Sequence, residues 1–278
     1  MIRCNLHTHT TFCDGKSTPR EMAEAALALG LDTLGFSGHA YTPFDGSFCL
    51  RDPRAFAREI GALKEEYRGR LHILLGAEWD LYGEVPYETD YVLGAVHYVK
   101  HRGEYYPIDH SPEGQARLFR HAYGGDTMSA VALYFETVVE MAERLRPDMI
   151  AHFDVITKFN EKHAFFDETG EQYLSLARQA LDAVLSVCPL IEVNTGGVFR
   201  GWRSAPYPAL PLLSYIKEKG GEVILSSDCH KREALAFGFE EALGLVRRAG
   251  FDRVQVYTPE GRRALSLGQA MQGYPQKN

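Results

Sequence analysis

Residues 2–15 of this 278-residue chain read IRCNLHTHTTFCDG, a short aliphatic run that leads into two histidines and an aspartate. The run IRCNLH predicts a β-strand over residues 2–7. Side chains at positions i and i+2 of an extended segment point the same way, roughly 6.5 to 7 Å apart, so His7 and His9 can face one centre. Asp14 follows five residues later on the loop. The rest of the chain repeats this pattern, and the repetition decides the fold.

Seven further aliphatic or β-branched runs predict strands, and amphipathic stretches of helical length lie between them. The predicted strands are LDTLGFS (31–37), LHILLGAE (71–78), YVLGAVH (91–97), DMIAHF (148–153), LIEVN (190–194), EVILSS (222–227) and RVQVY (253–257). The predicted helices are EMAEAALALG (21–30), RAFAREIGALKEEY (54–67), SAVALYFETVVEMAERL (129–145), YLSLARQALDAVLSV (173–187), PALPLLSYIKEK (208–219) and EEALGLVRRAG (240–250). This alternation predicts a parallel sheet, and seven or eight units without a GxGxxG fingerprint favour a closed α/β barrel.

The boundaries of the units support a single domain over residues 1–278. Glycine closes three predicted helices, at Gly30, Gly220 and Gly250, where a left-handed residue is needed. Residues 100–128 depart from the rhythm and predict a long insertion after the fourth strand. We find no linker segment rich enough in flexible residues to divide the chain.

Composition excludes several classes of partner. The net charge is −7, and nucleic acids or anionic membranes require a basic face. The first residues lack the apolar region of a signal peptide, and no apolar run approaches the ~18 residues that span a bilayer. We therefore expect a cytoplasmic enzyme that binds neither nucleic acid nor membrane, while its oligomeric state stays open. The five cysteines are scattered without a CxxC pair, which predicts reduced thiols.

Ionisable residues gather where the predicted strands end. They are His7, His9, His39, Glu78, His97, His152, Asp228 and His230, with Asp14 on the first loop. The carboxyl ends of the strands form the face on which barrel enzymes assemble active sites. One histidine near a strand end is usually an ordinary residue. Six of the eleven histidines and three carboxylates at one end of one barrel make chance a poor explanation. We expect His72, His110, His121 and His163 to be structural or exposed.

The motif order resembles the polymerase-and-histidinol-phosphatase (PHP) family. The motifs are HTH (7–9), Asp14, SGH ending at His39, GAE ending at Glu78, GAVH ending at His97, AHFD (151–154) with His152, and SDCH with Asp228 and His230. HTHTTFCDG, TKFN (157–160) and EVNTGG (192–197) resemble the histidinol-phosphatase branch. The resemblance implies a distorted (β/α)7 TIM-like barrel, which leaves the run at 253–257 outside the barrel, and a site for three divalent metal ions.

The resemblance also implies which residues hold each ion. His7, His9, Glu78 and Asp228 hold the first ion, Glu78, His97 and His152 the second, and Asp14, His39 and His230 the third. Mixed nitrogen and oxygen ligands suit zinc, iron or manganese, and the sequence does not choose among them. Asp14 is a hard ligand that favours manganese or iron at the third position.

The charge balance of such a site suits a phosphate monoester. Three divalent ions bring about six positive charges, and three carboxylates with one hydroxide remove about four, which leaves roughly +2 opposite a dianion. We expect a metal-bound hydroxide to attack phosphorus in line. The leaving group needs a proton, for which Asp228, His230 and a metal-bound water remain open.

Two cations on the same face are the expected phosphate-binding residues. Arg200 lies in NTGGVFRGWR (194–203) after the sixth strand and suits bidentate contact, and Lys158 in TKFN supplies a point charge. Arg203 is a weaker alternative. Three acidic residues could bind the substrate's amine or imidazole, and the sequence does not choose among Glu104, Asp109 and Glu161.

The resemblance therefore implies a histidinol-phosphatase that hydrolyses L-histidinol phosphate to L-histidinol and phosphate in histidine biosynthesis. One alternative is another phosphoesterase of the same family, acting on a different monoester, a diester or a nucleotide. The chain carries no polymerase module after the barrel, which lowers the exonuclease option. A non-catalytic metal-binding barrel is the other alternative, and the complete ligand set argues against it.

Overall fold

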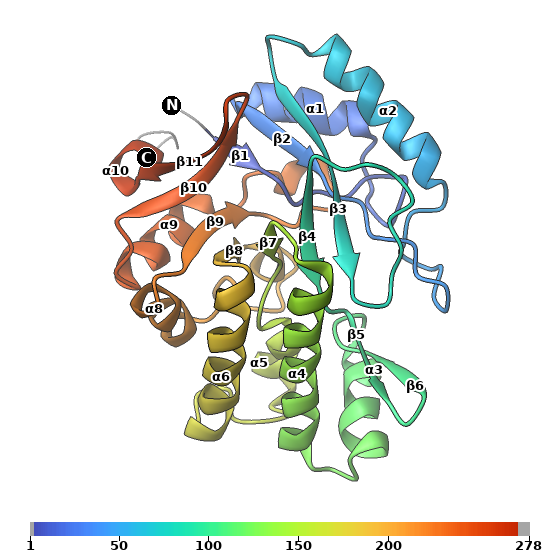
Figure 1. Ribbon diagram of the computed structural model, residues 1–278, viewed down its shortest axis with the longest axis vertical. Helices are drawn as coiled ribbons and strands as arrows, with labels where there is room; N and C mark the ends of the chain where they lie inside the picture. Colours follow the sequence, from blue (N-terminus) through green and yellow to red (C-terminus); the bar gives the residue numbers. More distant parts are fainter. Residues whose placement is uncertain (1–2, 272–278) are drawn as a thin grey trace.

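The computed structural model describes residues 3–271, so Ile2 of the first predicted strand and the last seven residues of the predicted domain lie outside it. Within these residues nine strands form one curled sheet, in the order β1-β2-β3-β4-β7-β8-β9-β10-β11 (Figure 1). They are β1 (Cys4–Asn5), β2 (Thr33–Phe36), β3 (His72–Asp80), β4 (Tyr91–Ala95), β7 (Met149–Ile150), β8 (Leu190–Asn194), β9 (Glu222–Ser226), β10 (Arg253–Thr258) and β11 (Gly261–Ser266). All neighbours from β1 to β10 pair in parallel, which confirms the predicted α/β class.

The first and seventh parallel strands of the described residues meet at their carboxyl ends. Thr8, just after β1, forms a parallel bridge with Cys229, just after β9, and the His9 amide donates to the Cys229 carbonyl at 2.9 Å. The ring of seven strands is therefore joined at the end where the predicted ligands lie, and the distorted (β/α)7 barrel is confirmed.

The eighth predicted run forms β10. It pairs with β9 through Gln255 and Ile224, and with β11 along its whole length. At the amino-terminal end of the barrel it also reaches β2, because the Thr33 hydroxyl donates to the Tyr257 carbonyl at 2.7 Å. The run at 253–257 thus belongs to the sheet, although the seven-strand ring closes without it.

The six predicted helices are all present, and local signals fix their ends. They are α1 (Pro19–Ala28), α2 (Pro53–Glu66), α4 (Thr127–Leu145), α6 (Glu171–Val187), α8 (Leu210–Glu218) and α9 (Phe239–Arg248). Thr18 and Glu21 form a capping box at α1, where Pro19 occupies the first position. Gly30 has a φ of +69°, the left-handed conformation that the sequence predicts after α1. No helix within residues 3–271 combines the length and the hydropathy needed to cross a bilayer.

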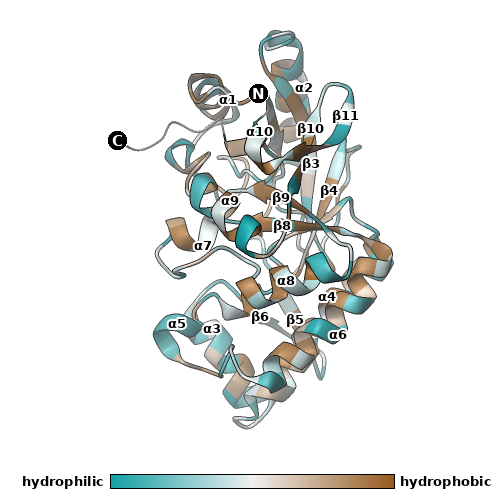
Figure 2. Cartoon of the chain, turned by 90° about the vertical axis from the view of Figure 1, so that its left-hand side faces the viewer, coloured by the Kyte–Doolittle hydropathy of each residue, from teal (hydrophilic) through white to brown (hydrophobic). Residues whose placement is uncertain are grey.

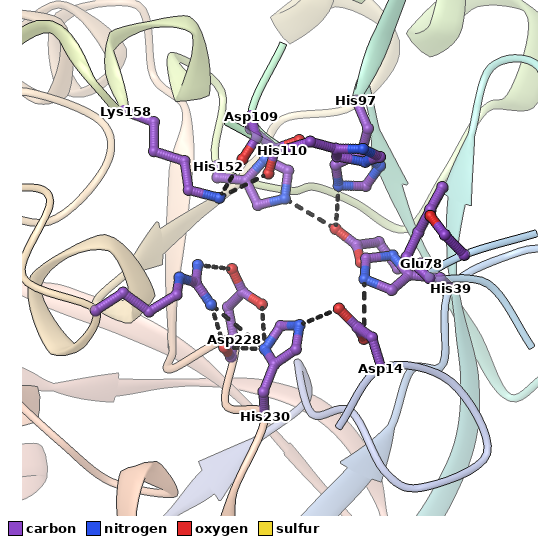
Figure 3. Close-up of a pocket in the computed structure, with 13 residues that line it drawn as sticks. Asp14, His39, Glu78, His97, Asp109, His110, His152, Lys158, Asp228 and His230 are labelled. Atoms are coloured by element: carbon purple, nitrogen blue, oxygen red, sulfur yellow. Dashed lines mark hydrogen bonds and ion pairs between the residues drawn. The ribbon is translucent and has the colours of Figure 1, made fainter. Parts of the chain in front are cut away.

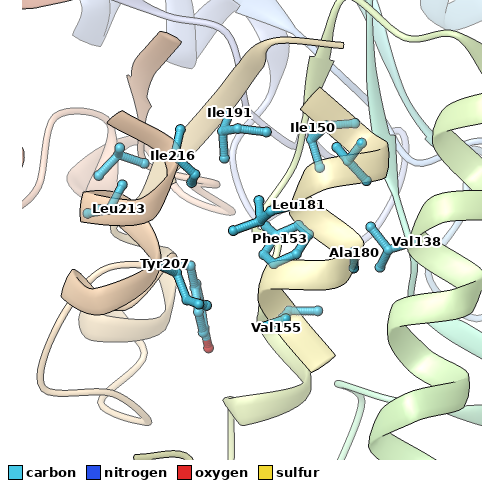
Figure 4. Close-up of a cluster of buried hydrophobic side chains, with 14 of the residues drawn as sticks. Val138, Ile150, Phe153, Val155, Ala180, Leu181, Ile191, Tyr207, Leu213 and Ile216 are labelled. Atoms are coloured by element: carbon cyan, nitrogen blue, oxygen red, sulfur yellow. The ribbon is translucent and has the colours of Figure 1, made fainter. Parts of the chain in front are cut away.

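The core lies between the sheet and its outer helices. Ile150 and Ile191 of β7 and β8 pack with Leu181 of α6 and Ile216 of α8, and all four side chains are fully buried (Figure 4). Each such residue contributes about 1.5–3 kcal/mol by burial. Figure 2 shows the hydrophobic colour on strands β8 and β9, inside the layer of helices. This packing holds the strand ends, and the side chains on them, in fixed positions.

The predicted insertion at 100–128 contains a hairpin and short helical turns. The hairpin joins β5 (Tyr98–His101) to β6 (Glu104–Pro107), and α3 (Pro112–Arg117) follows with a π-helical turn over Leu118–Ala122. Aromatic contacts fix the hairpin against the loop after β2, since the ring of Phe44 stacks on Tyr105 at 3.8 Å between centroids. The two segments together form one wall beside the strand ends.

Candidate metal centre

The carboxyl ends of the parallel strands surround a cavity of about 370 Å³. Its lining residues are Asp14, His39, Ser47, Phe48, Glu78, His97, Asp109, His110, His152, Lys158, Arg200, Asp228 and His230. Figure 3 shows the labelled side chains converging on this space from the separate strands. The remaining two predicted ligands, His7 and His9, are fully buried and contact Glu78 and Asp228. The structure therefore brings all nine predicted ligands together.

Glu78 on β3 lies at the middle of the histidines. Among the described residues, five ring nitrogens approach its carboxylate: His152 Nε2 at 2.8 Å, His97 Nε2 at 3.1 Å and His7 Nε2 at 3.3 Å from Oε1, with His39 Nδ1 at 2.8 Å and His9 Nε2 at 3.4 Å from Oε2. Burial raises the pKa of the Glu78 carboxyl, but the charges of His7, His39 and His97 outweigh it and hold the pKa well below its ordinary value. Glu78 is therefore an ionised carboxylate available to more than one ion.

Asp228, just after β9, provides the second buried carboxylate. Its Oδ1 lies 3.3 Å from His9 Nε2 and 3.6 Å from His7 Nε2. Asp228 has a φ of +45° and His152 a φ of +21°, in the left-handed region that residues with a side chain seldom adopt. Such backbone strain is found mainly at functional sites, where the surrounding structure compensates for it.

A third group lies at the cavity mouth around Asp14. Its carboxylate oxygens lie 3.6 Å from His39 Nε2 and 3.1 Å from His230 Nε2. The His9 ring stacks against each of those two histidines, with 4.2 Å to each centroid. Burial, followed by the charges of His39 and His230, lowers the pKa of His9 to about 3, so this ring is neutral. A neutral imidazole is the form that binds a metal.

Several buried atoms of this cluster fit divalent ions. His7 Nε2, His9 Nε2 and Asp14 Oδ1 are buried without a hydrogen-bond partner. Burying a polar atom without a partner is costly, and such atoms call for an explanation. Their separations of 3.3 to 3.6 Å from the facing ligand atoms are long for hydrogen bonds. Two ligands of one tetrahedral ion, each about 2.1 Å from it, lie about 3.4 Å apart.

The ligand atoms fall into overlapping groups within the described residues. Atoms within 4.8 Å of one another come from His9, Asp14, His39 and His230; from His7, His9 and Glu78; from His7, His152 and Asp228; and from His39, Glu78 and His97. The three sets expected from the sequence share most of these members. Three contacts differ, because His9 also joins the Asp14 group, His152 also lies near Asp228, and His39 also joins Glu78 and His97.

Arg200 contacts the metal-ligand cluster directly. Its Nη2 donates to Asp228 Oδ2 at 2.7 Å, and its Nη1 donates to the Asp228 carbonyl at 3.1 Å. Burial lowers the pKa of the guanidinium, but the Asp228 carboxylate outweighs it and keeps the pKa above its ordinary value. The side chain lines the cavity, as the phosphate-binding prediction requires.

Lys158 lines the cavity in an ion pair. Its Nζ donates to two atoms of Asp109, the backbone carbonyl oxygen at 2.7 Å and Oδ2 at 3.0 Å. Burial raises the pKa of the Asp109 carboxyl, but Lys158 and His97 outweigh it and lower the pKa below its ordinary value. The other oxygen, Asp109 Oδ1, is buried without a hydrogen-bond partner. The positive charge of Lys158, which we expect to bind phosphate, is therefore paired with the carboxylate of Asp109, 49 residues earlier in the chain.

The remaining candidates for substrate binding, Arg203, Glu104 and Glu161, do not line the cavity. Arg203 pairs with Glu168 at 2.7 Å and with Glu161 at 3.3 Å, so it ties the loop after β8 to the segment after β7. Glu104 is exposed and pairs with Arg117. Among the acidic candidates for the substrate's amine, Asp109 alone lines the cavity.

The sequence did not predict that two buried carboxylates contact the candidate ligands, or that one further histidine lines the cavity. Glu192 Oε1 accepts from His7 Nδ1 at 2.6 Å, and Asp80 Oδ2 accepts from the His97 amide at 2.7 Å. Asp80 stands two residues after Glu78 on the same strand, a spacing that could have revealed it. The expectation that His110 is structural or exposed is wrong, because it lines the cavity with its ring 4.9 Å from that of Phe48.

Comparisons with known proteins agree with this arrangement. The model of the PHP domain family matches residues 5–196. A probable histidinol-phosphatase of Deinococcus radiodurans is 31% identical over 264 residues, which cover 89% of this chain and 94% of the relative. A histidinol-phosphatase of Bacillus subtilis is 25% identical over 87% of this chain and 99% of its own. The crystal structure of histidinol phosphate phosphatase from Lactococcus lactis, complexed with zinc, L-histidinol and phosphate, shares the fold with a TM-score of 0.71, at 18% identity over 94% of this chain and 98% of that one.

Proposed function

This chain belongs to the PHP domain family, and from that premise we propose that it is a histidinol-phosphatase, a phosphomonoesterase that hydrolyses L-histidinol phosphate in histidine biosynthesis. The observation that carries the proposal is the convergence of nine candidate metal ligands, seven of which line one cavity together with Arg200. The similarity to the probable histidinol-phosphatase of Deinococcus radiodurans, which extends over 94% of that relative, supports the histidinol-phosphatase branch. The proposal includes a cytoplasmic location and a single domain over residues 1–278.

We propose the ligand sets that the family resemblance implies. His7, His9, Glu78 and Asp228 would hold one divalent ion, Glu78, His97 and His152 a second, and Asp14, His39 and His230 a third. Zinc, manganese or iron held there would supply Lewis-acid chemistry to a phosphoryl group and lower the pKa of a water molecule. The buried ligand atoms without hydrogen-bond partners support this assignment.

The protein's own cations would bind the phosphoryl oxygens. Arg200 presents a planar fork at the cavity wall, and such a fork binds two phosphate oxygens at once. Its contacts with Asp228 hold the fork in place before substrate arrives, which lowers the entropic cost of binding. Asp228 and His230 are the proposed residues for moving a proton to the leaving oxygen. His230 is the more exposed of the two, with 24% of its side chain accessible at the cavity edge.

The Asp109 and Lys158 pair would bind both ends of the substrate. Lys158 Nζ is within the cavity and can donate to phosphate, while the carboxylate of Asp109, which also lines the cavity, can accept from an ammonium or an imidazole N–H. Phe48 and His110 form an aromatic wall close to this pair. A small cationic alcohol phosphate matches these charges.

A turnover panel tests the proposed function. Purified protein reconstituted with zinc, manganese or iron is assayed with L-histidinol phosphate, sugar phosphates, other amino-alcohol phosphates and a phosphodiester. We expect the highest kcat/KM for L-histidinol phosphate. A higher kcat/KM for the diester would contradict the proposal and favour another phosphoesterase of the family.

A further inference from the structure

Glu192 is a carboxylate in the middle of β8 that lies behind the candidate metal centre and does not line the cavity. Its side chain is fully buried. Oε1 accepts from His7 Nδ1 at 2.6 Å and from the Ser226 hydroxyl. Oε2 accepts from the His152 amide at 2.7 Å and from Asn194 Nδ2 at 2.8 Å. Each oxygen therefore has two donors, and the carboxylate is held at four points.

The contact with His7 fixes which ring nitrogen carries hydrogen. An ionised carboxylate only accepts hydrogen bonds, so His7 Nδ1 is the donor. In the neutral ring, the form that binds a metal, Nε2 then carries the lone pair, and it faces Glu78 and Asp228 at 3.3 and 3.6 Å. A metal-ligating histidine commonly donates its other N–H to a carboxylate in this way, which fixes the ring and raises its basicity.

The contact with His152 holds a strained backbone. His152 has a φ of +21°, and the hydrogen bond from its amide to Glu192 Oε2 lies at that strained residue. From this position its Nε2 reaches Glu78 Oε1 at 2.8 Å. Asn194, two residues along β8, binds the same oxygen and pairs through its own backbone with Tyr207. The strand thus carries a rigid support for the turn after β7.

We infer that Glu192 is a positioning residue that aligns His7 and His152, two ligands from opposite sides of β8, so that two of the three proposed ions depend on it. The hydrogen bonds of the Glu192 carboxylate within residues 3–271 include none to the third set, which is Asp14, His39 and His230. This inference rests on the metal sites of the proposed function. It assigns to one side chain a role at two ions.

The test replaces Glu192 with glutamine, which keeps the shape and adds an N–H donor. In Glu192→Gln an NH2 group replaces one of the two oxygens, so the two donors that face that oxygen meet another donor. A glutamine N–H toward His7 Nδ1 also favours the tautomer with hydrogen on Nε2. We expect metal content after reconstitution with zinc to fall from about three ions per chain to about one, and the affinity of the lost ions to fall about 10–100-fold in chelator competition.

The matched control is Glu222→Gln on the neighbouring strand β9. Glu222, like Glu192, accepts from a side-chain amide, with Gln255 Nε2 at 2.8 Å, but it stands at the start of β9, the end of the barrel away from the cavity. We expect wild-type metal content for this variant. A Glu192→Gln protein whose zinc affinity stays within about twofold of wild type would overturn the inference.

Two measurements separate positioning from a folding defect. Metal-free Glu192→Gln should melt within a few degrees of the metal-free wild type, while its Tm rise on adding zinc should be smaller. Glu192→Asp keeps an acceptor-only group and should retain more zinc than Glu192→Gln; the reverse order would point to a packing role and overturn the inference.

A wild-type protein that binds three ions but fails to hydrolyse L-histidinol phosphate would contradict the proposed function and leave this inference standing.

Discussion

Arg200 and Asp228 form an ion pair at the cavity wall, in which Nη2 of the arginine lies 2.7 Å from Oδ2 of the aspartate. The same guanidinium donates to the Asp228 carbonyl at 3.1 Å. Asp228 has left-handed backbone geometry, with its other carboxylate oxygen toward His7 and His9. A candidate phosphate-binding cation and a candidate metal ligand therefore orient each other.

Substitutions of Arg200 should distinguish the contribution of its positive charge to substrate binding from that of its forked geometry. Arg200→Met should raise KM for L-histidinol phosphate, and Arg200→Lys should fall between it and wild type, because lysine keeps the charge without the fork. The loss of a charged hydrogen bond, about 1.5–3 kcal/mol, corresponds to roughly 10–100-fold in kcat/KM. Steady-state kinetics with metal analysis on the same samples checks this. Arg178→Met, on the outside of α6, is the control, and an unchanged KM in Arg200→Met would remove Arg200 from the site.

Lys158 and Asp109 should act on substrate as one unit. Lys158→Met and Asp109→Asn are each expected to lower kcat/KM about tenfold or more, since each leaves a buried partner without its counter-charge. The double variant should lose clearly less than the product of the two single losses. A double-mutant cycle on kcat/KM measures this coupling. Strictly multiplicative losses would mean that the two side chains serve substrate separately.

Metal removal should abolish activity and lower thermal stability together. The buried ligand atoms of His7, His9 and Asp14 have no hydrogen-bond partner to replace an ion. Each ion at 100 times its Kd adds about 2.7 kcal/mol to the free energy of unfolding. We expect a chelator to lower the Tm by several degrees, and zinc, manganese or iron to restore it. Calorimetry with and without chelator measures the change; a Tm that does not respond would contradict the metal assignment.

Asp154 should make stability fall as the pH rises. Burial raises the pKa of this carboxyl from its ordinary 3.8 to about 6, and its Oδ2 accepts from the Ala209 amide at 3.1 Å. The folded state thus holds the proton more tightly than the unfolded chain, so stability is lost between about pH 4 and pH 6 as the pH rises. The loss above that window is about 3 kcal/mol.

Asp154→Asn keeps the acceptor and removes this titration. Urea unfolding of the metal-free proteins should show the variant to be more stable than wild type at pH 8, with the difference vanishing near pH 4. Lower stability of the variant at pH 8 would mean that Arg203 needs the Asp154 charge, since that arginine lowers the pKa of this carboxyl.

Much of the fold could be predicted because its signals are local. The alternation of aliphatic runs with apolar residues three and four apart located all six long helices, and LIEVN matched β8 at both ends. Polar residues at or just after the ends of these runs identified eight of the nine side chains that the barrel brings together, and the ninth, Asp14, lies on the first loop. Parallel strands in one barrel bring their carboxyl ends to one face, so this gathering follows from the pattern alone.

The tertiary structure decided which of these side chains touch. Lys158 with Asp109 and Glu192 with His7 are pairs 49 and 185 residues apart in the chain, and only strand register and barrel closure make them neighbours. The contact of Glu192 with His7 is hidden from sequence analysis, because nothing local marks a carboxylate inside an apolar strand as the partner of a distant histidine. The sequence by itself determined the strands, the helices and the types of ligand, which depend on periodicity along the chain. Only folding decided the pairs, because a hydrogen bond depends on distances across the barrel.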